Sequence, residues 1–242
     1  MEVKAIKTSI FKEKESLVDF IVRYIPKIKE STVLVITSKI VALSEGRTAT
    51  IKNKGTKEHL ILEESEFAMP TKYAWLTIKD GVFMASAGID ESNANGKLIL
   101  LPKDSYKSAD FLRRCLQKRY KVKNLGILIT DSRTVPLRAG IIGMAVGYAG
   151  LSGIKDYRGE KDIFGRKFKF SRVDIVDSLA ATAVLLMGEG KEQKPLAIIE
   201  KPPVKFCGKV SKKELYINPK EDMYGPLFFK IYKSNLKLKN GT

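Results

Sequence analysis

The chain has 242 residues, 44% of them hydrophobic, which is enough for one large folded domain or two small ones with a substantial core. This composition excludes a disordered tail. Its 44 lysines and arginines outnumber its 27 aspartates and glutamates, giving a formal net charge of +17. The excess favours an anionic partner such as a nucleotide, nucleic acid, anionic lipid or acidic peptide, although a lysine-rich proteome would also yield basic enzymes.

Histidine and cysteine are too scarce to support several common chemistries. Cys115 and Cys207 belong to no CxxC pair, so neither a zinc site nor a disulfide framework is indicated. The single histidine, His59, lies in a polar stretch and is predicted to be a solvated loop residue. Because no signal peptide or membrane-spanning segment is recognisable, we expect a cytoplasmic protein in a reducing environment.

Helices and strands alternate in the first part of the chain. Residues 17–28 have helical apolar spacing, and residues 33–37 form a short β-branched strand of the buried type. Residues 75–78 and 82–85 predict a hairpin that turns at residues 79–81.

Three further elements are expected before residue 190. Residues 108–120 predict a helix with Ser108 as its N-cap and a basic C-terminal half. Residues 126–129 predict a buried strand that ends abruptly in a polar run. Residues 174–187 form the clearest helix of the sequence, and Gly188 ends it.

Two stretches of unusual composition remain. An apolar segment carries glycines at three- and four-residue steps, namely Gly140, Gly143, Gly147, Gly150 and Gly153. This spacing favours close helix packing over a set of turns along a substrate channel. After residue 200 the chain becomes lysine-rich. We therefore expect a core over residues 1–200 and a basic segment over residues 201–242, partly packed on the core and with its last dozen residues disordered.

Acidic and hydroxyl side chains follow two of the strand-like runs. One cluster spans residues 88–93 and includes Asp90, and the other spans residues 130–132. Their oxygen atoms are the hard ligands that Mg²⁺ or Mn²⁺ accepts. The simpler alternative is that each aspartate merely closes a turn through its own backbone.

A third oxygen source is Glu189, which lies between Gly188 and Gly190. The two glycines would let backbone approach a bound anion while the carboxylate faces a cation. Taken alone, Gly188 is more simply a helix stop. The chain has neither the phosphate-binding P-loop motif nor the Rossmann fingerprint, so a nucleotide would be bound by other means.

Arginines accompany these clusters. Arg133 and Arg138 follow Asp131, and Arg158 and Arg166 lie in a later charged stretch. Because a guanidinium group matches phosphate or carboxylate, the four together predict a polyanion site. Surface salt bridges are the alternative, which is equally supported for Arg158.

Six linked motifs together resemble one known family. They read TSKIVALSEGR, SAGIDESNA, ITDS, RAGIIGMAVGYAGL, KDYRGEKDIFGRKF and VDSLAATAVLLMGEG, followed by KPLAIIE. In order and spacing, over roughly residues 1–230, they are similar to the coenzyme F-420-0:L-glutamate ligases, the F-420 gamma-glutamyl ligases.

The resemblance implies an α+β fold, a mixed α/β ligase that forms an intertwined homodimer. It also implies a GTP- or ATP-dependent amide ligase that requires Mg²⁺ or Mn²⁺ and adds L-glutamate to a carboxylate acceptor. The implied metal ligands are Asp90, Asp131, Ser132 and Glu189. The implied nucleotide contacts are Ser38, Lys39 and Asn93, with the backbone at Gly188 and Gly190 and with residues 8–11 near the guanine. Asp131, Arg133 and Arg138 are the candidate catalytic residues.

The resemblance also implies a mechanism in which the acceptor carboxylate is phosphorylated and glutamate's amine then displaces phosphate. Two anions must meet, and metal ions with arginines offset their repulsion. Membrane partners are not expected, and nucleic acid is disfavoured.

This chain departs from the family pattern near the expected phosphate and acceptor positions. Leu43 replaces a lysine, Thr134 and Val135 stand where Gly-Arg is common, and Glu160 replaces an arginine. A divergent member is therefore expected, whose acceptor is F-420-0 or another carboxylate, such as a glutamate chain or a peptide carboxyl terminus. The alternative is a catalytically idle relative that binds nucleic acid or ribosomes through its lysines. The presence of all three acidic residues, Asp90, Asp131 and Glu189, favours the enzyme, because a protein that only binds nucleic acid has no need of acids in a basic surface.

Overall fold

A five-stranded mixed sheet forms the centre of the protein. The structure is a computed structural model that describes residues 1–53 and 55–228. The strand order is β1-β12-β2-β8-β9. The strands are β1 (Glu2–Ile6), β12 (Leu196–Glu200), β2 (Thr32–Thr37), β8 (Leu125–Thr134) and β9 (Ile141–Ala149). β2 and β8 pair in parallel, whereas the other neighbours are antiparallel.

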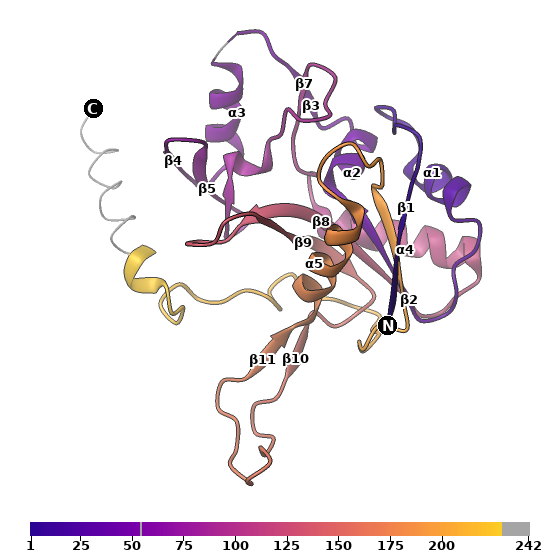
Figure 1. The fold of residues 1–242 in the computed structure, drawn as a ribbon, viewed down its shortest axis with the longest axis vertical. Coiled ribbons are helices and arrows are strands. Elements are labelled where there is room, and N and C mark those ends of the chain that lie inside the picture. The colour runs from indigo at the N-terminus through magenta and orange to yellow at the C-terminus, as the bar shows by residue number, and fades with distance from the viewer. Residues whose placement is uncertain (54, 229–242) are drawn as a thin grey trace.

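Both faces of the sheet are buried, because successive side chains of β2 point to opposite sides and all are apolar between its terminal threonines. Val33 and Val35 pack with α5 (Ile175–Met187) on one face. Leu34 and Ile36 pack on the other face with α1 (Leu17–Tyr24) and α4 (Ser105–Tyr120). Figure 1 shows the sheet between α5 on one side and α1 with α4 on the other.

The expected helices are confirmed, with one difference in their capping. α5 occupies the predicted range, and Asp174 caps it by accepting a hydrogen bond from the backbone of Asp177. α1 ends at Tyr24, before the predicted end at residue 28, because Pro26 disfavours helical geometry at the residue that precedes it. α4 begins earlier than predicted, because its N-cap is Asp104 rather than Ser108. The Ser108 hydroxyl instead donates to Glu45 at 2.6 Å, which ties α4 to the end of α2 (Ser38–Ser44).

A smaller lobe is inserted between α2 and α4. It contains β3 (Thr48–Thr50), α3 (Thr56–Glu64), β4 (Phe67–Pro70), β5 (Trp75–Lys79), β6 (Val82–Ala85), a 3-10 turn (Ser86–Gly88) and β7 (Lys97–Ile99). The predicted hairpin is confirmed as β5 and β6. His59 is exposed, as expected, but it lies in helix α3 and not in a loop. The lobe has its own small apolar core and lies above the sheet in Figure 1.

The predicted strand at residues 126–129 is longer than the apolar run that signalled it. β8 continues through the polar residues to Thr134, because β9 pairs with it across this whole length. The register shifts after Ile129, where Val146 of β9 has no direct partner. The backbone N–H of Ala145 at this bulge donates to the Asp177 carboxylate of α5 at 2.8 Å.

The glycine-rich segment is a strand, so the expectation of helix packing or channel turns was wrong. β9 runs through it and is approached closely by two helices. A Cβ atom at Gly143 would lie 2.7 Å from the carbonyl oxygen of Ala180 in α5, and one at Gly147 would lie 2.5 Å from the backbone of Ser105 in α4. Close packing is therefore the reason for these glycines, but it is the packing of helices against a strand.

Two segments extend beyond this core. Strands β10 (Ile154–Asp156) and β11 (Arg172–Asp174) form the base of an arm that projects away from the rest of the chain in Figure 1. The segment after residue 200 runs back along the body, and Val204 and Phe206 pack against the core under α5. The expectation for the last dozen residues falls outside the described part of the chain. No described helix is long and apolar enough to cross a membrane.

We predict that Gly143→Ala destabilises the protein by about 1–3 kcal/mol, because the new methyl group would overlap Val184 and the Ala180 carbonyl. Gly208→Ala is the matched control, since a Cβ atom there meets nothing within 4 Å. Urea unfolding midpoints of the two variants measure the difference. Equal stability of the two would show that α5 does not press on β9.

A second prediction concerns the cap of α5. Burial, together with the charge of Asp177, raises the pKa of Asp174 to about 6. The folded state therefore holds a proton that the unfolded state has released, so this group's contribution to stability is lost as pH rises from about 4 through 6. Asp174→Asn keeps a capping oxygen and removes the charge. We expect a higher melting temperature than wild type at pH 7.5, worth roughly 1 kcal/mol after allowance for partial solvent exposure, and a smaller gain at pH 4.5.

The control for this variant is Asp174→Ala, which removes both the charge and the cap. Thermal unfolding of all three proteins across this pH range checks the prediction. It fails if the asparagine variant is less stable than wild type at pH 7.5.

Candidate active site

The parallel pairing of β2 and β8 brings the first two candidate residues together. Thr37 ends β2 opposite Thr130 of β8, so the residues that follow them emerge at the same edge of the sheet. Ser38 begins α2 there, and its hydroxyl donates to Asp131 Oδ1 at 3.0 Å. Ligands of open α/β sheets bind at this carboxyl edge, because the chain turns away and leaves a crevice.

A second group is contributed by the inserted lobe. Lys39 of α2 forms an ion pair with Asp90 at 2.7 Å and donates to the hydroxyl of Ser92 at 2.8 Å. Asp90 also accepts hydrogen bonds from the backbone and hydroxyl of Ser92, at 2.7 and 2.9 Å. The turn that the simpler reading of Asp90 predicted is therefore present, and it presents the carboxylate to a lysine of the main body.

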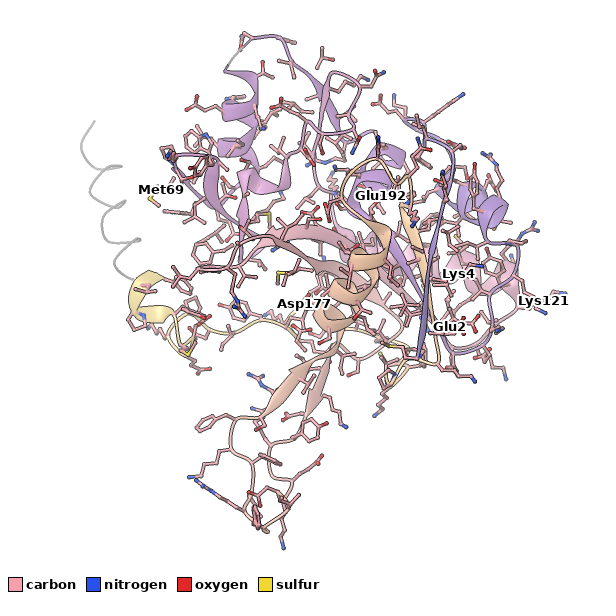
Figure 2. All side chains as sticks on the ribbon, in the orientation of Figure 1. Glu2, Lys4, Met69, Lys121, Asp177 and Glu192 are labelled. Carbon is pink, nitrogen blue, oxygen red and sulfur yellow. The ribbon has the colours of Figure 1, made fainter. Side chains whose placement is uncertain are left out.

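The loop after α5 completes the arrangement. The amide of Asn93 donates to the carbonyl oxygen of Gly190 at 3.4 Å, which links the lobe to this loop. The hydroxyl of Ser132 is hydrogen-bonded to the carboxylate of Glu189. Glu192 accepts a hydrogen bond from the backbone of Gly190 at 2.8 Å. Figure 2 shows Glu192 in the loop that connects α5 with β12.

The two aspartates of the site have opposite electrostatic environments. Burial tends to raise the pKa of Asp90, but hydrogen bonds from Lys39 and Ser92 outweigh it and lower the pKa. For Asp131 burial dominates, and the charges and hydrogen bonds of Arg133 and Ser38 only partly offset it, so its pKa is raised. Asp131 is therefore a carboxylate that lacks sufficient nearby positive charge.

The four implied metal ligands are divided between the two faces of β8. Asp131 and Ser132 are consecutive strand residues, so their side chains point to opposite sides. Asp131 faces Ser38, and Ser132 faces Glu189. Within residues 1–53 and 55–228, no three acidic, histidine or cysteine side chains converge closely enough to hold a metal ion.

The four arginines are not gathered into one polyanion site within the single described chain. Arg133 is 6% exposed and directs its guanidinium group to the carbonyl of Phe83 at 3.4 Å. Arg138 is exposed in the β8–β9 hairpin loop, beyond the last paired residues. Arg158 binds Asp156 at the base of the arm, which is the salt-bridge alternative, and Arg166 lies farther out on the arm.

The structure also shows the surroundings of residues 8–11 and of Leu43. The backbone N–H of Thr8 donates to the carbonyl of Gln193 at 2.9 Å, so the first residue of the 8–11 segment lies beside the loop after α5. Phe11 itself is buried against Phe20 and is not available to a ligand. Leu43, which replaces the expected lysine, packs against the main core.

Sequence reasoning included Ser92 in the cluster of residues 88–93 without giving it a role of its own, and it overlooked Glu192. The role of Ser92 could have been predicted, because a serine two residues after an aspartate is typical of an Asx turn. Glu192 gave no comparable signal, since its contact depends on the conformation of the loop after α5.

Carboxylates, hydroxyls and a lysine at the carboxyl edge of a parallel strand pair define an enzyme that handles charged small molecules. The family model for F420-0:gamma-glutamyl ligase matches residues 5–201. The coenzyme F420:L-glutamate ligase of Methanococcus maripaludis strain C7 is 34% identical over 244 residues, which cover 93% of this chain and 97% of the relative. That of Methanocaldococcus jannaschii is 34% identical over 242 residues, covering 92% and 95%.

The enzyme of the same name from Archaeoglobus fulgidus is 30% identical over 232 residues, covering 88% of this chain and 92% of the relative. The chain belongs to the F420-0:gamma-glutamyl ligase family, as the six motifs indicated, and it is a glutamate ligase by that membership.

We predict that Ser132→Ala loosens the loop after α5, because it removes the hydrogen bond that holds Glu189. Backbone amides of residues 189–193 should exchange hydrogen several-fold faster in deuterium exchange followed by mass spectrometry. Thr182→Ala is the control, since its hydroxyl donates to the carbonyl of Ser178 within α5 and does not contact the loop. Unchanged exchange, or the same acceleration in the control, would contradict this role of Ser132.

Proposed function

We propose that this enzyme uses GTP or ATP, with Mg²⁺ or Mn²⁺, to join L-glutamate to a carboxylate acceptor through an acyl phosphate. The acceptor is F420-0 or another carboxylate, such as a glutamate chain or a peptide carboxyl terminus. The observation that carries the proposal is the convergence of Ser38, Asp131 and the Lys39–Asp90 pair at one sheet edge. Membership of the ligase family supports the same reaction class.

A divalent cation suits the donors at this edge. The pKa of the half-buried Asp131 carboxylate is raised, so nearby positive charge would stabilise its ionised form. The oxygen donors of Asp90, Asp131, Ser132 and Glu189 are of the hard type that Mg²⁺ and Mn²⁺ accept. Because Asp131 and Ser132 point to opposite faces of β8, one ion would be held on the Asp131 side and another by Ser132 with Glu189. Bound there, the ions would supply charge neutralisation between the triphosphate and the acceptor.

The proposed reaction has two balanced steps. An acceptor carboxylate oxygen attacks the γ-phosphorus, and the bond from that phosphorus to the nucleoside diphosphate breaks. The amine nitrogen of glutamate then attacks the acyl carbon, inorganic phosphate leaves with its bonding electrons, and the nitrogen loses a proton. The product is an amide, and one triphosphate is consumed for each glutamate added.

The chain's own residues have separate tasks in this scheme. Lys39, Ser38 and Asn93 would orient the triphosphate from the main body and the lobe. The backbone at Gly188 and Gly190 would let the loop after α5 approach its anionic oxygens closely. Arg133 lies on the same face of β8 as Asp131. We propose that its positive charge stabilises the ionised form of the Asp131 carboxylate. Arg138, at the hairpin tip, would meet the acceptor's negative charge.

We also propose that two copies form a homodimer that completes the site. The arm exposes Ile163, Phe164 and Phe170 by 92%, 88% and 86%, and α5 exposes Leu185 by 82%. Such large apolar side chains favour burial against a second copy. A partner's arm would also bring Arg158 and Arg166 toward the hairpin loop that carries Arg138, which one chain does not do.

The first experiment incubates the purified protein with glutamate, GTP or ATP, and Mg²⁺ or Mn²⁺, with and without F420-0. Mass spectrometry should detect products heavier by whole glutamate residues, and the tube that contains them identifies the acceptor class. We expect Asp131→Asn to lower turnover at least 100-fold without loss of fold, because the anionic partner of the site is removed.

Asp19→Asn is the matched control, since Asp19 is an exposed acid of α1. Wild-type turnover in Asp131→Asn would remove Asp131 from the reaction. If no tube gained mass while the protein bound RNA with steep salt dependence, the ligase proposal would give way to the nucleic-acid-binding alternative.

A further inference from the structure

A second charged hollow lies at the other end of the β8–β9 pair. It has a volume of about 430 Å³ and lies between the segment after residue 200 and Ser152, just past β9. Tyr148 of β9 donates a hydrogen bond to Glu214, which lines the pocket, and it pairs with Leu128, three residues before Asp131 along β8. Tyr148 is thus about 10 Å along the strand from the candidate active site.

The segment that walls this pocket is anchored to the body by its backbone. Cys207 donates to the carbonyl of Gly150 at 3.0 Å, and Ser152 donates to that of Lys205 at 2.9 Å. Phe206, between them, packs on the core. These contacts fix the position of the wall on the body of the protein.

The single carboxylate of the pocket is already fully used. Glu214 accepts hydrogen bonds from the hydroxyls of Tyr148 and Ser152, at 2.7 and 3.0 Å. It also accepts from the backbone of Gly153 and Ile154, at 3.0 and 3.4 Å. Burial tends to raise the pKa of Glu214, but these bonds outweigh it and lower the pKa. Glu214 thus stays charged, with both oxygens directed to donors of the body.

Three lysines remain around the same hollow without an acidic partner. Lys205, Lys209 and Lys213 line it, and none of them forms an ion pair with any residue in the described part of the chain. Their neighbour Lys212, by contrast, pairs with Asp104 at 2.5 Å. Three ammonium groups that share one concave surface create a positive potential that attracts a multiply charged anion.

We propose that this pocket binds a small, multiply charged oxyanion, a phosphate or a polycarboxylate, between the three lysines. Ser152 and Ser211, which also line it, offer hydroxyl donors to the same oxygens. A bound anion would hold the lysine-rich segment against the base of the arm, because Ser152 lies two residues before the start of β10. This site is separate from the ligase reaction and does not depend on it.

The experiment uses Cys207, which lines the pocket, as a local reporter. The rate of its alkylation by iodoacetamide is measured by peptide mass spectrometry, with Cys115, the other free thiol, as an internal reference. The probes are inorganic phosphate and triglutamate, each compared with sodium chloride at equal ionic strength. Neither nucleotide nor divalent metal is present, so the outcome is independent of ligase activity.

We expect phosphate, triglutamate or both to slow alkylation of Cys207 at least threefold in a saturable manner. The alkylation rate of Cys115 should not change. The triple variant K205Q/K209Q/K213Q should lose this protection. The control K4Q/K27Q/K118Q removes the same charge from exposed lysines elsewhere and should retain it. Figure 2 labels Lys4 on β1, where it pairs with Ile198 of β12 and is not among the residues that line the pocket.

Protection by phosphate alone or by triglutamate alone supports the proposal and identifies the ligand's chemistry. The proposal is overturned if neither probe protects Cys207 in wild type. It is likewise overturned if the two triple variants lose protection equally, because general charge would then explain the effect.

Discussion

The parallel pairing of β2 with β8 places Thr37 opposite Thr130, and most of the candidate site depends on this register. Ser38 and Asp131 are 93 positions apart in the chain, yet they are hydrogen-bonded because each follows its threonine at the same edge. A shift of one residue in β8 would turn Asp131 to the other face of the sheet. Burial of apolar side chains on both faces of β2 and β8 makes such a shift costly.

Two charged residues at this edge, Asp131 and Arg133, lie in an electrostatically unfavourable environment. Asp131 is half-buried with too little compensating charge, and Arg133 is buried beside it, with the pKa of each displaced toward its neutral form by loss of solvent. Buried charged groups with shifted pKa values are common at sites that act on charged substrates. The ordinary core around it, built from the apolar side chains of β2, β8 and the covering helices, provides the stability that this arrangement lacks.

The site also depends on elements that reach the edge from outside the sheet. The inserted lobe delivers Asp90 and Asn93, and α5 delivers Glu189 and Gly190. α5 is held in place by its close packing on Gly143 of β9 and by Asp177, which binds the backbone of the β9 bulge. Small residues far from the chemistry therefore set the position of the loop that carries Glu189.

The sequence by itself determined α1, β2, the β5–β6 hairpin and α5, because hydrophobic periodicity and turn residues act locally. Its motifs also identified the family, and they marked the acidic residues found at or near the sheet edge. The true length of β8, the strand state of the glycine run and the burial of Arg133 were decided by tertiary structure. The backbone of β9 forms hydrogen bonds with the polar end of β8, and the inserted lobe covers Arg133. Neither partner is visible in the local pattern, since both contacts join residues that are distant along the chain.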